Sequence, residues 1–383
     1  MATTMNPSSG ADQPAAPVGN VAATSPMQRY WKDILWAARL TVSITVLAIG
    51  HTLPFFWHQL SCLIILAVLV WPVRSVRWGT LYNLFVLGFF FAFPIVGGQY
   101  LIEKIAWGGQ SPILGSALVA PFTEEPGKIL PLLLLLAVGR LGYRSSYGAC
   151  DLMLCGVALG AGFGFFEDSS RLQNHYPTPN GPSLFGIPVF PDSYGGFLGH
   201  SASTGFIGLA LGCMLYAVRW RKWLLAGIAG SLFVPLWMMV DHGLSNYAVW
   251  SSRSNWFLLT RWIWDMDGQG NLSPYVFFTL LVLAVVTERV LLWWVLKGFR
   301  RLSLSSCLAY VRRPLNMGWG YPQLRAVVWR IRSLQLYVLS YRQLAFLMAH
   351  WKGDLPRNLE VFAPLIARCT GQVAITQLAV RES

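Results

Sequence analysis

The chain has 383 residues, of which 55% are hydrophobic and only 12% are charged, and its mean hydropathy is +0.49. These values lie outside the range of ordinary soluble domains. The formal net charge is +13, but no nucleic-acid-binding motif accompanies the basic residues, so the charge indicates attraction to anionic lipid. The sequence therefore predicts an integral membrane protein with no nucleic-acid partner.

Three regions follow one another along the chain. Residues 1–30 are rich in small and polar residues and lack the apolar segment of a signal peptide, which predicts a disordered N-terminal tail. Residues 31–301 form the predicted transmembrane domain, an all-α bundle of about eight membrane helices. The eight apolar stretches run at about 38–57, 59–73, 79–101, 112–139, 147–167, 195–218, 222–246 and 274–297.

The basic residues that flank these stretches predict the topology. If the N-terminus is cytoplasmic, twelve Lys and Arg residues lie on the cytoplasmic side and four on the other. Because cytoplasmic loops carry the excess of basic residues in membrane proteins, this bias places both termini in the cytoplasm.

A basic tail follows the last span. Residues 302–383 hold ten Lys and Arg residues and three Asp and Glu residues. Apolar residues recur at helical spacing between Leu324 and Leu334, with arginines between them. We expect this cytoplasmic tail to contain an amphipathic helix that binds anionic lipid.

Ionisable residues in four of the spans need an explanation, because each costs on the order of 3 kcal/mol in hydrocarbon. The stretch "PFTEEPGKIL" carries Glu124, Glu125 and Lys128. The helical rise from the cytoplasmic end of each span places Glu124 and Glu167 about 24 Å deep. The same count places His200 and His242 roughly 28–30 Å deep. Four helices are thus predicted to bring these groups to one level, in the outer third of the bilayer.

Each group also has a structural interpretation when it is considered alone. Glu124 and Lys128 share a helix face and fit an intramembrane ion pair. His200 fits a hydrogen bond between helices, and His242 with Asn246 fits a helix end near the membrane interface. These separate interpretations leave the common depth unexplained, so the set favours a functional site.

Two carboxylates and two imidazoles with a nearby amide suffice for hydrolysis of a peptide bond by water. A glutamate in an apolar site can take the proton of the attacking water. A histidine and Asn246 can donate hydrogen bonds to the oxyanion that forms.

Four motifs in order carry a resemblance to a known family. "EEPGK" fits EExxK, Phe163 to Glu167 fits FxxxE, His200 begins "HSASTG", and His242 to Asn246 fits HxxxN. With this order over about residues 80–250, the chain resembles the PrsW family of intramembrane proteases and its CAAX-processing and bacteriocin-processing relatives.

The resemblance implies a glutamic-type intramembrane protease of a bacterial plasma membrane, with no cofactor and no metal. It implies Glu124 as the general base, supported by Glu125 and Glu167, with His200 and His242 orienting water or stabilising the oxyanion. Lys128, Asn246 and Phe163 are the implied supporting residues. The implied substrate is a membrane-anchored protein, of which anti-sigma factors are the family's associated example, cut near the outer face. The CAAX relatives carry His where this chain has Glu167, which leaves the division of roles between Glu167 and His200 open.

Three other functions compete with this interpretation. A zinc metalloprotease is one alternative, since the possible zinc ligands include Glu124, Glu167, His200 and His242, although HExxH is absent. "GHSA", with a later histidine, suits a rhomboid-type serine protease but leaves the glutamates unexplained. A proton-coupled transporter suits buried carboxylates on a helix broken by Gly and Pro.

Overall fold

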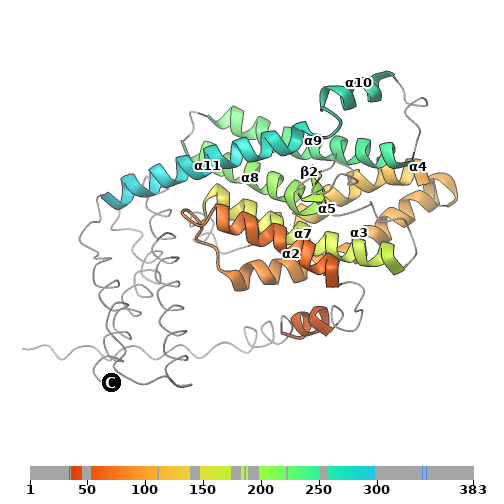
Figure 1. Cartoon of the computed structure of the whole chain (residues 1–383), viewed down its shortest axis with the longest axis horizontal. Helices are drawn as coiled ribbons and strands as arrows, with labels where there is room; N and C mark the ends of the chain where they lie inside the picture. The colour runs from red at the N-terminus through yellow and green to blue at the C-terminus, as the bar shows by residue number, and fades with distance from the viewer. Residues whose placement is uncertain are drawn as a thin grey trace, which may run out of the picture.

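The structure is a computed structural model, and it describes residues 34, 36–44, 53–109, 112–138, 147–173, 183–184, 187–188, 198–220, 223–250, 258–297, 339 and 342. This part of the chain is almost entirely helical (Figure 1). The helices are α2 (Leu53–Leu69), α3 (Trp78–Trp107), α4 (Pro112–Leu114), the π-helix η2 (Gly115–Val119), α5 (Ala120–Val138), α7 (Ala149–Gln173), α8 (Gly199–Trp220), α9 (Leu224–Trp250), α10 (Leu258–Met266) and α11 (Leu272–Lys297). A short antiparallel hairpin pairs β1 (Ser183–Leu184) with β2 (Ile187–Pro188).

Helix α7 is the centre of the bundle. It packs most extensively on α8 and α3, and also contacts α2, α5 and α11. In Figure 1, α2 and α3 lie on one side of α7, and α8 and α9 lie on the other. Of its apolar stretch, 94% is buried inside the protein, against 17–28% for the other long apolar helices. Helix α7 is therefore shielded from lipid by its neighbours.

Glycines allow the neighbouring helices to approach α7 at backbone distance. A Cβ atom at Gly160 would lie 2.1 Å from the carbonyl oxygen of His200 on α8. On the opposite face, a Cβ atom at Gly162 would lie 1.9 Å from the carbonyl oxygen of Phe85 on α3. Since membrane helices gain packing contacts where small residues let backbones meet, these glycines set how closely α3 and α8 flank α7.

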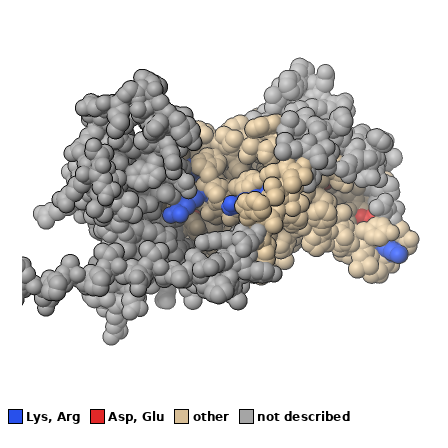
Figure 2. Space-filling model, turned by 90° about the horizontal axis from the view of Figure 1, so that it is seen from below, with Lys and Arg blue, Asp and Glu red and all other residues tan. Residues whose placement is uncertain are grey.

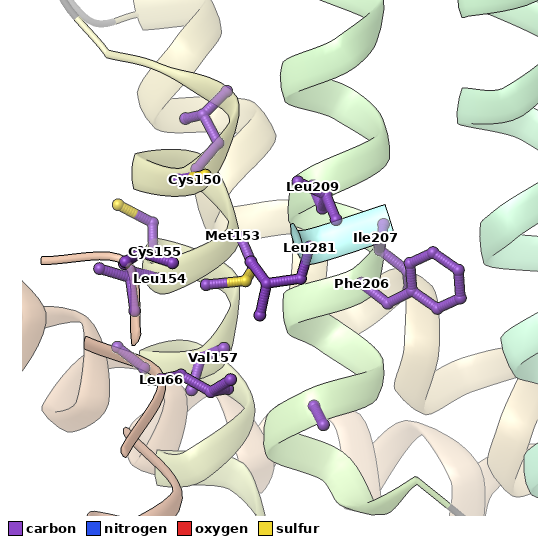
Figure 3. Close-up of a cluster of buried hydrophobic side chains, with 14 of the residues drawn as sticks. Leu66, Cys150, Met153, Leu154, Cys155, Val157, Phe206, Ile207, Leu209 and Leu281 are labelled. Atoms are coloured by element: carbon purple, nitrogen blue, oxygen red, sulfur yellow. The ribbon is translucent and has the colours of Figure 1, made fainter. Parts of the chain in front are cut away.

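The apolar core lies mainly between α7 and α8. Figure 3 shows Met153 and Val157 on the side of α7 that faces α8, while Phe206 projects from the far side of α8. There the ring of Phe206 packs on that of Phe277 of α11, with 5.6 Å between their centres. Leu66 of α2 extends this cluster on one side. The polar residues at the other end of α7 and α8 are thus attached to a rigid, close-packed pair of helices.

The outer surface of the bundle is apolar. Large apolar side chains on α3, α9 and α11 are exposed, among them Ile105, Leu232 and Val282, which are 77%, 62% and 60% exposed. The described surface in Figure 2 shows few charged residues. Four described helices are long and apolar enough to cross a membrane, namely those at Trp78–Trp107, Ala149–Ser170, Leu224–Ala248 and Leu272–Trp293. These features agree with a membrane helix bundle, whereas the count of eight spans and the cytoplasmic termini stay predictions.

Several predicted boundaries differ from the structure. The sequence predicts residues 53–57 at the end of the first span, but in the structure they begin α2, because Pro54 is compatible with the first turn of a helix. The segment 112–139 is not one regular helix, since η2 precedes α5. The sequence reasoning also missed α10. The predicted N-terminal tail, residues 1–30, and the amphipathic stretch Leu324 to Leu334 lie outside the described residues.

Candidate active site

Four helices bring the predicted carboxylates and imidazoles together. Helix α5 supplies Glu124 and Glu125, α7 supplies Glu167, α8 supplies His200 and α9 supplies His242. Glu124, Glu125 and His242 are buried, and Glu167 and His200 are partly buried. These side chains form one continuous cluster, which we call the Glu–His cluster.

Glu125 is the most enclosed member of the cluster. Its carboxylate is fully buried and lies 2.5 Å from the ammonium nitrogen of Lys128, one helical turn away. Its second oxygen lies 3.4 Å from the hydroxyl of Ser203, which donates to it. The sequence predicted Lys128 as the partner of Glu124 on the same face, but the structure pairs it with Glu125. The buried charges of Glu125 and Lys128 compensate each other.

Lys128 also reaches two residues on neighbouring helices. Its ammonium nitrogen lies 2.8 Å from Nδ1 of His200 and 4.9 Å from the ring centre of Phe163. The ring of Phe163 in turn contacts the ring of His200, with 5.2 Å between their centres. The predicted supporting residues Lys128 and Phe163 thus hold His200 from two sides.

The two histidines lie side by side and are each oriented by a glutamate. Their ring centres are 5.2 Å apart, and the rings are inclined at 74°. Nδ1 of His242 lies 3.0 Å from Oε1 of Glu125, and Nε2 of His242 lies 4.0 Å from Oε2 of Glu124. Nε2 of His200 contacts Oε2 of Glu167. His200 therefore has a carboxylate at one nitrogen, and His242 has a carboxylate near each of its nitrogens.

Asn246 is not part of the cluster. Its side-chain amide donates to the backbone carbonyl of Ser116 in η2, at 2.8 Å. On the same face of α9, a Cβ atom at Gly243 would lie 2.5 Å from the carbonyl oxygen of Ala117. The structure therefore contradicts the expected orientation of Asn246 towards an oxyanion. The amide instead fixes the π-helix that leads directly into the glutamate-bearing α5.

The sequence reasoning missed Gln59 on α2. Its side chain is 7% exposed, accepts a hydrogen bond from Ser201 at 2.5 Å and donates one to Asp168 at 3.1 Å. Ser201 follows His200 and Asp168 follows Glu167 in sequence, so one amide joins the two helices directly behind the cluster. The available signal is a side-chain amide in a mostly apolar helix, at the residue where the sequence predicts the second span to begin. Because the hydroxyl of Ser201 is engaged by Gln59, the rhomboid-type alternative gains no support.

The cluster has the composition of a metal-binding site. One ligand atom each from Glu124, His200 and His242 lie within 4.8 Å of one another. Two imidazoles and one carboxylate form a set that catalytic zinc sites use. In such sites a carboxylate that does not bind the metal often accepts a hydrogen bond from the second nitrogen of a ligating histidine. Glu125 contacts Nδ1 of His242 in this way, and Nε2 of the same ring faces Glu124. These residues fit a divalent metal ion.

The fold and this cluster define a class: a membrane-embedded helical protein with a buried site of glutamates and histidines suited to hydrolysis. Residues 76–298 match the PrsW family, described as intramembrane metalloproteases, and the chain belongs to that family. The resemblance predicted from the four motifs is confirmed, and with it a transmembrane protease. No curated protein and no solved structure matches the chain.

Proposed function

We propose that this protein is an intramembrane endopeptidase that hydrolyses a peptide bond of a membrane-anchored protein at the Glu–His cluster, with the help of a divalent metal ion. The convergence of Glu124, His200 and His242 within 4.8 Å is the observation that carries the proposal. These three residues would hold the ion. When bound, such an ion lowers the pKa of a water molecule and polarises the carbonyl group of the substrate.

The other residues of the cluster have roles that follow from their contacts. Glu125 accepts the Nδ1 proton of His242 and so keeps Nε2 of that ring unprotonated. Lys128 compensates the charge of Glu125. Glu125 and Glu167 both lie outside the ligand set, but Glu125 is engaged by Lys128 and His242. Glu167 is therefore the carboxylate that takes the proton of the attacking water and passes it to the leaving amine.

The contacts of His200 favour a second candidate, the metal-free glutamate mechanism. If charged Lys128 donates to Nδ1 of His200, the proton of this imidazole is on Nε2 and faces Glu167. In that tautomer Nε2 has no lone pair for a metal ion. Glu124 is then the general base, and a water molecule fits between Glu124 and Nε2 of His242, which are 4.0 Å apart.

Metal content and cleavage together test both candidates. The full-length protein in proteoliposomes is supplied with a single-span reporter peptide, with and without 1,10-phenanthroline, and bound metal is measured by mass spectrometry. The first candidate predicts about one metal ion per chain, loss of cleavage with the chelator and recovery with added zinc. Cleavage by metal-free protein that is lost in Glu124→Gln supports the second. A Glu124→Gln protein that cleaves at the wild-type rate rules out both.

Glu288→Gln is the matched control. Glu288 is another buried glutamate, on α11, and accepts hydrogen bonds from the backbone of Ala149 and the hydroxyl of Tyr216. Ala149 begins α7, whereas Glu167 lies near its end, so the two glutamates are about 27 Å apart along the helix. Glutamine can accept the same hydrogen bonds, so we expect Glu288→Gln to keep its activity.

The proposal also covers the membrane topology of the protein and the face of the membrane near which the substrate is cleaved. We propose a multi-pass protein of the bacterial plasma membrane with an N-terminal tail (1–30), a transmembrane protease domain (31–301) and a cytoplasmic tail (302–383) that binds anionic lipid. The charge bias supports cytoplasmic termini, which puts the Glu–His cluster in the outer third of the bilayer. Cleavage of a membrane-anchored substrate such as an anti-sigma factor would then occur near the outer face. We expect reporter fusions after residues 222 and 301 to lie in the cytoplasm and a fusion after residue 253 to lie outside the cell membrane. If the fusion after residue 301 reports an outside location, this topology is wrong.

A further inference from the structure

The turn that joins α2 to α3 contains a fully buried arginine. The side chain of Arg74 is 0% exposed, and its guanidinium lies between the rings of Trp71 and Trp78, 4.6 Å and 4.3 Å from their centres. None of its three guanidinium nitrogens has a hydrogen-bond partner within the described residues. The two rings stabilise the positive charge but accept no strong hydrogen bond. A buried guanidinium of this kind requires an anion.

Burial lowers the pKa of Arg74, and the negative charge of Asp151 opposes this, but within the described residues Asp151 accepts no hydrogen bond from the guanidinium. Its carboxylate accepts hydrogen bonds from the backbone nitrogens of Ser75, Val76 and Gly148, at 2.7 Å, 2.9 Å and 3.2 Å. It also accepts the hydroxyl proton of Ser75. Asp151 is therefore the anchor of the α2–α3 turn on the start of α7, and its oxygens are already occupied by these donors.

A second arginine lies over the same turn. Arg342, from the C-terminal region, donates to the backbone carbonyls of Trp71 and Arg74, at 2.5 Å and 2.8 Å. Burial lowers the pKa of Arg342 to about 10; the negative charge of Asp151 raises it, and the positive charges of Arg289 and Arg74 lower it. Two guanidinium groups thus act on one turn together with a single carboxylate, Asp151, whose oxygens already accept other hydrogen bonds.

An apolar cavity adjoins this basic turn. It has a volume of about 160 Å³ and lies between α2 and α3, lined by Phe56, Leu60 and Leu63 on one side and by Leu81 and Phe85 on the other. Trp78 lines the cavity and also covers one face of the Arg74 guanidinium. The Trp78 residue is 38% exposed, so its ring lies at the surface between the guanidinium and the cavity. A cationic group and an apolar cavity are therefore adjacent.

We propose that the α2–α3 turn and this cavity bind one anionic phospholipid. The phosphate pairs with the guanidinium groups of Arg74 and Arg342, since planar guanidinium groups match phosphate oxygens well. One acyl chain occupies the cavity against Leu60 and Leu63. Trp71 and Trp78 stand where the apolar helices end, which is where tryptophans meet lipid headgroups. The bound lipid supplies a hydrogen-bonding anion for Arg74 and fastens Arg342 to the α2–α3 turn.

Binding of lipid by the full-length protein tests the proposal. The protein in neutral detergent is titrated with phosphatidylglycerol, phosphatidylcholine or inorganic phosphate, and bound lipid is followed by native mass spectrometry and by thermal unfolding. We expect saturable binding of one phosphatidylglycerol per chain with a raised unfolding temperature. Equal binding of phosphatidylcholine overturns the proposal, as does an equal effect of inorganic phosphate, which would show a free-anion site.

Three variants separate the headgroup site from the cavity. Arg74→Met and Arg342→Gln are each expected to weaken phosphatidylglycerol binding by about tenfold or more, because a charge-assisted phosphate contact is lost. Leu60→Trp fills the cavity and is expected to weaken lipid binding while leaving the arginines in place. Arg77→Gln removes a neighbouring positive charge that is outside the site and serves as the control. If Arg74→Met does not fold, the other two variants decide: unchanged lipid binding in both refutes the proposal.

Discussion

The Glu125–Lys128 pair predicts a sharp separation between stability, metal binding and catalysis. Glu125→Gln leaves the shape of the side chain nearly unchanged but removes the negative charge next to Lys128. Both side chains are almost completely buried, 0% and 1% exposed, so the ammonium group loses its counter-ion without gaining water. Removing one partner of a buried pair typically costs about 3–5 kcal/mol. For a chain of 383 residues we expect the unfolding temperature to fall by roughly 4–6 °C.

The same substitution also disturbs His242. Glu125 accepts the Nδ1 proton of this ring at 3.0 Å, and the loss of such an outer carboxylate typically weakens metal binding about 10- to 100-fold. We therefore expect Glu125→Gln to regain part of its cleavage activity at high zinc concentration. Glu124→Gln, which changes a proposed ligand itself, is expected to regain little.

A double variant distinguishes charge compensation from general damage. Glu125→Gln combined with Lys128→Met removes both charges, so the unfolding temperature is expected to recover towards that of the wild type while cleavage stays low. Thermal unfolding in detergent, zinc titration and reporter-peptide cleavage measure the three quantities. A Glu125→Gln protein that unfolds at the wild-type temperature and binds zinc with unchanged affinity would refute this account of the pair.

Three further predictions follow from other parts of the chain. Gly160→Ala forces α7 and α8 apart at His200, so we expect it to destabilise the fold by about 1–3 kcal/mol and to reduce cleavage. Gly97→Ala is the control, because a Cβ atom at Gly97 has no neighbour within 4 Å. We expect this control to change neither the unfolding temperature nor the cleavage rate. Gln59→Leu removes the amide between α7 and α8, so we expect kcat to fall about 10-fold with little change in KM. An unchanged kcat would show that this amide does not position the site. We expect the isolated segment 302–383 to bind anionic vesicles and to dissociate from them as the salt concentration rises. Equal binding to neutral vesicles at every salt concentration would contradict the electrostatic explanation.

Composition predicted the class of protein, and helical rise predicted that Glu124, Glu167, His200 and His242 lie at one depth; the family motif added Glu125 to this set. Apolar stretches of membrane length identify the spans because hydrocarbon leaves helices almost no alternative. Glutamates and histidines in such stretches are costly, so their presence at one depth indicated a site before any contact was known. Glu124, Glu125, Glu167, His200 and His242 do lie together in the structure.

Only the tertiary structure decided which partners these residues have. The i, i+4 spacing suggested Glu124 as the partner of Lys128, but the ion pair forms with Glu125, because that face of α5 is enclosed by α8 and α9. Asn246 was expected to point into the site, yet it donates to a carbonyl of η2. Such choices depend on the rotation of each helix and on close approach at glycines such as Gly160, which arise from packing between segments far apart in sequence. A periodic pattern along one helix contains no information on which neighbour its polar face will meet.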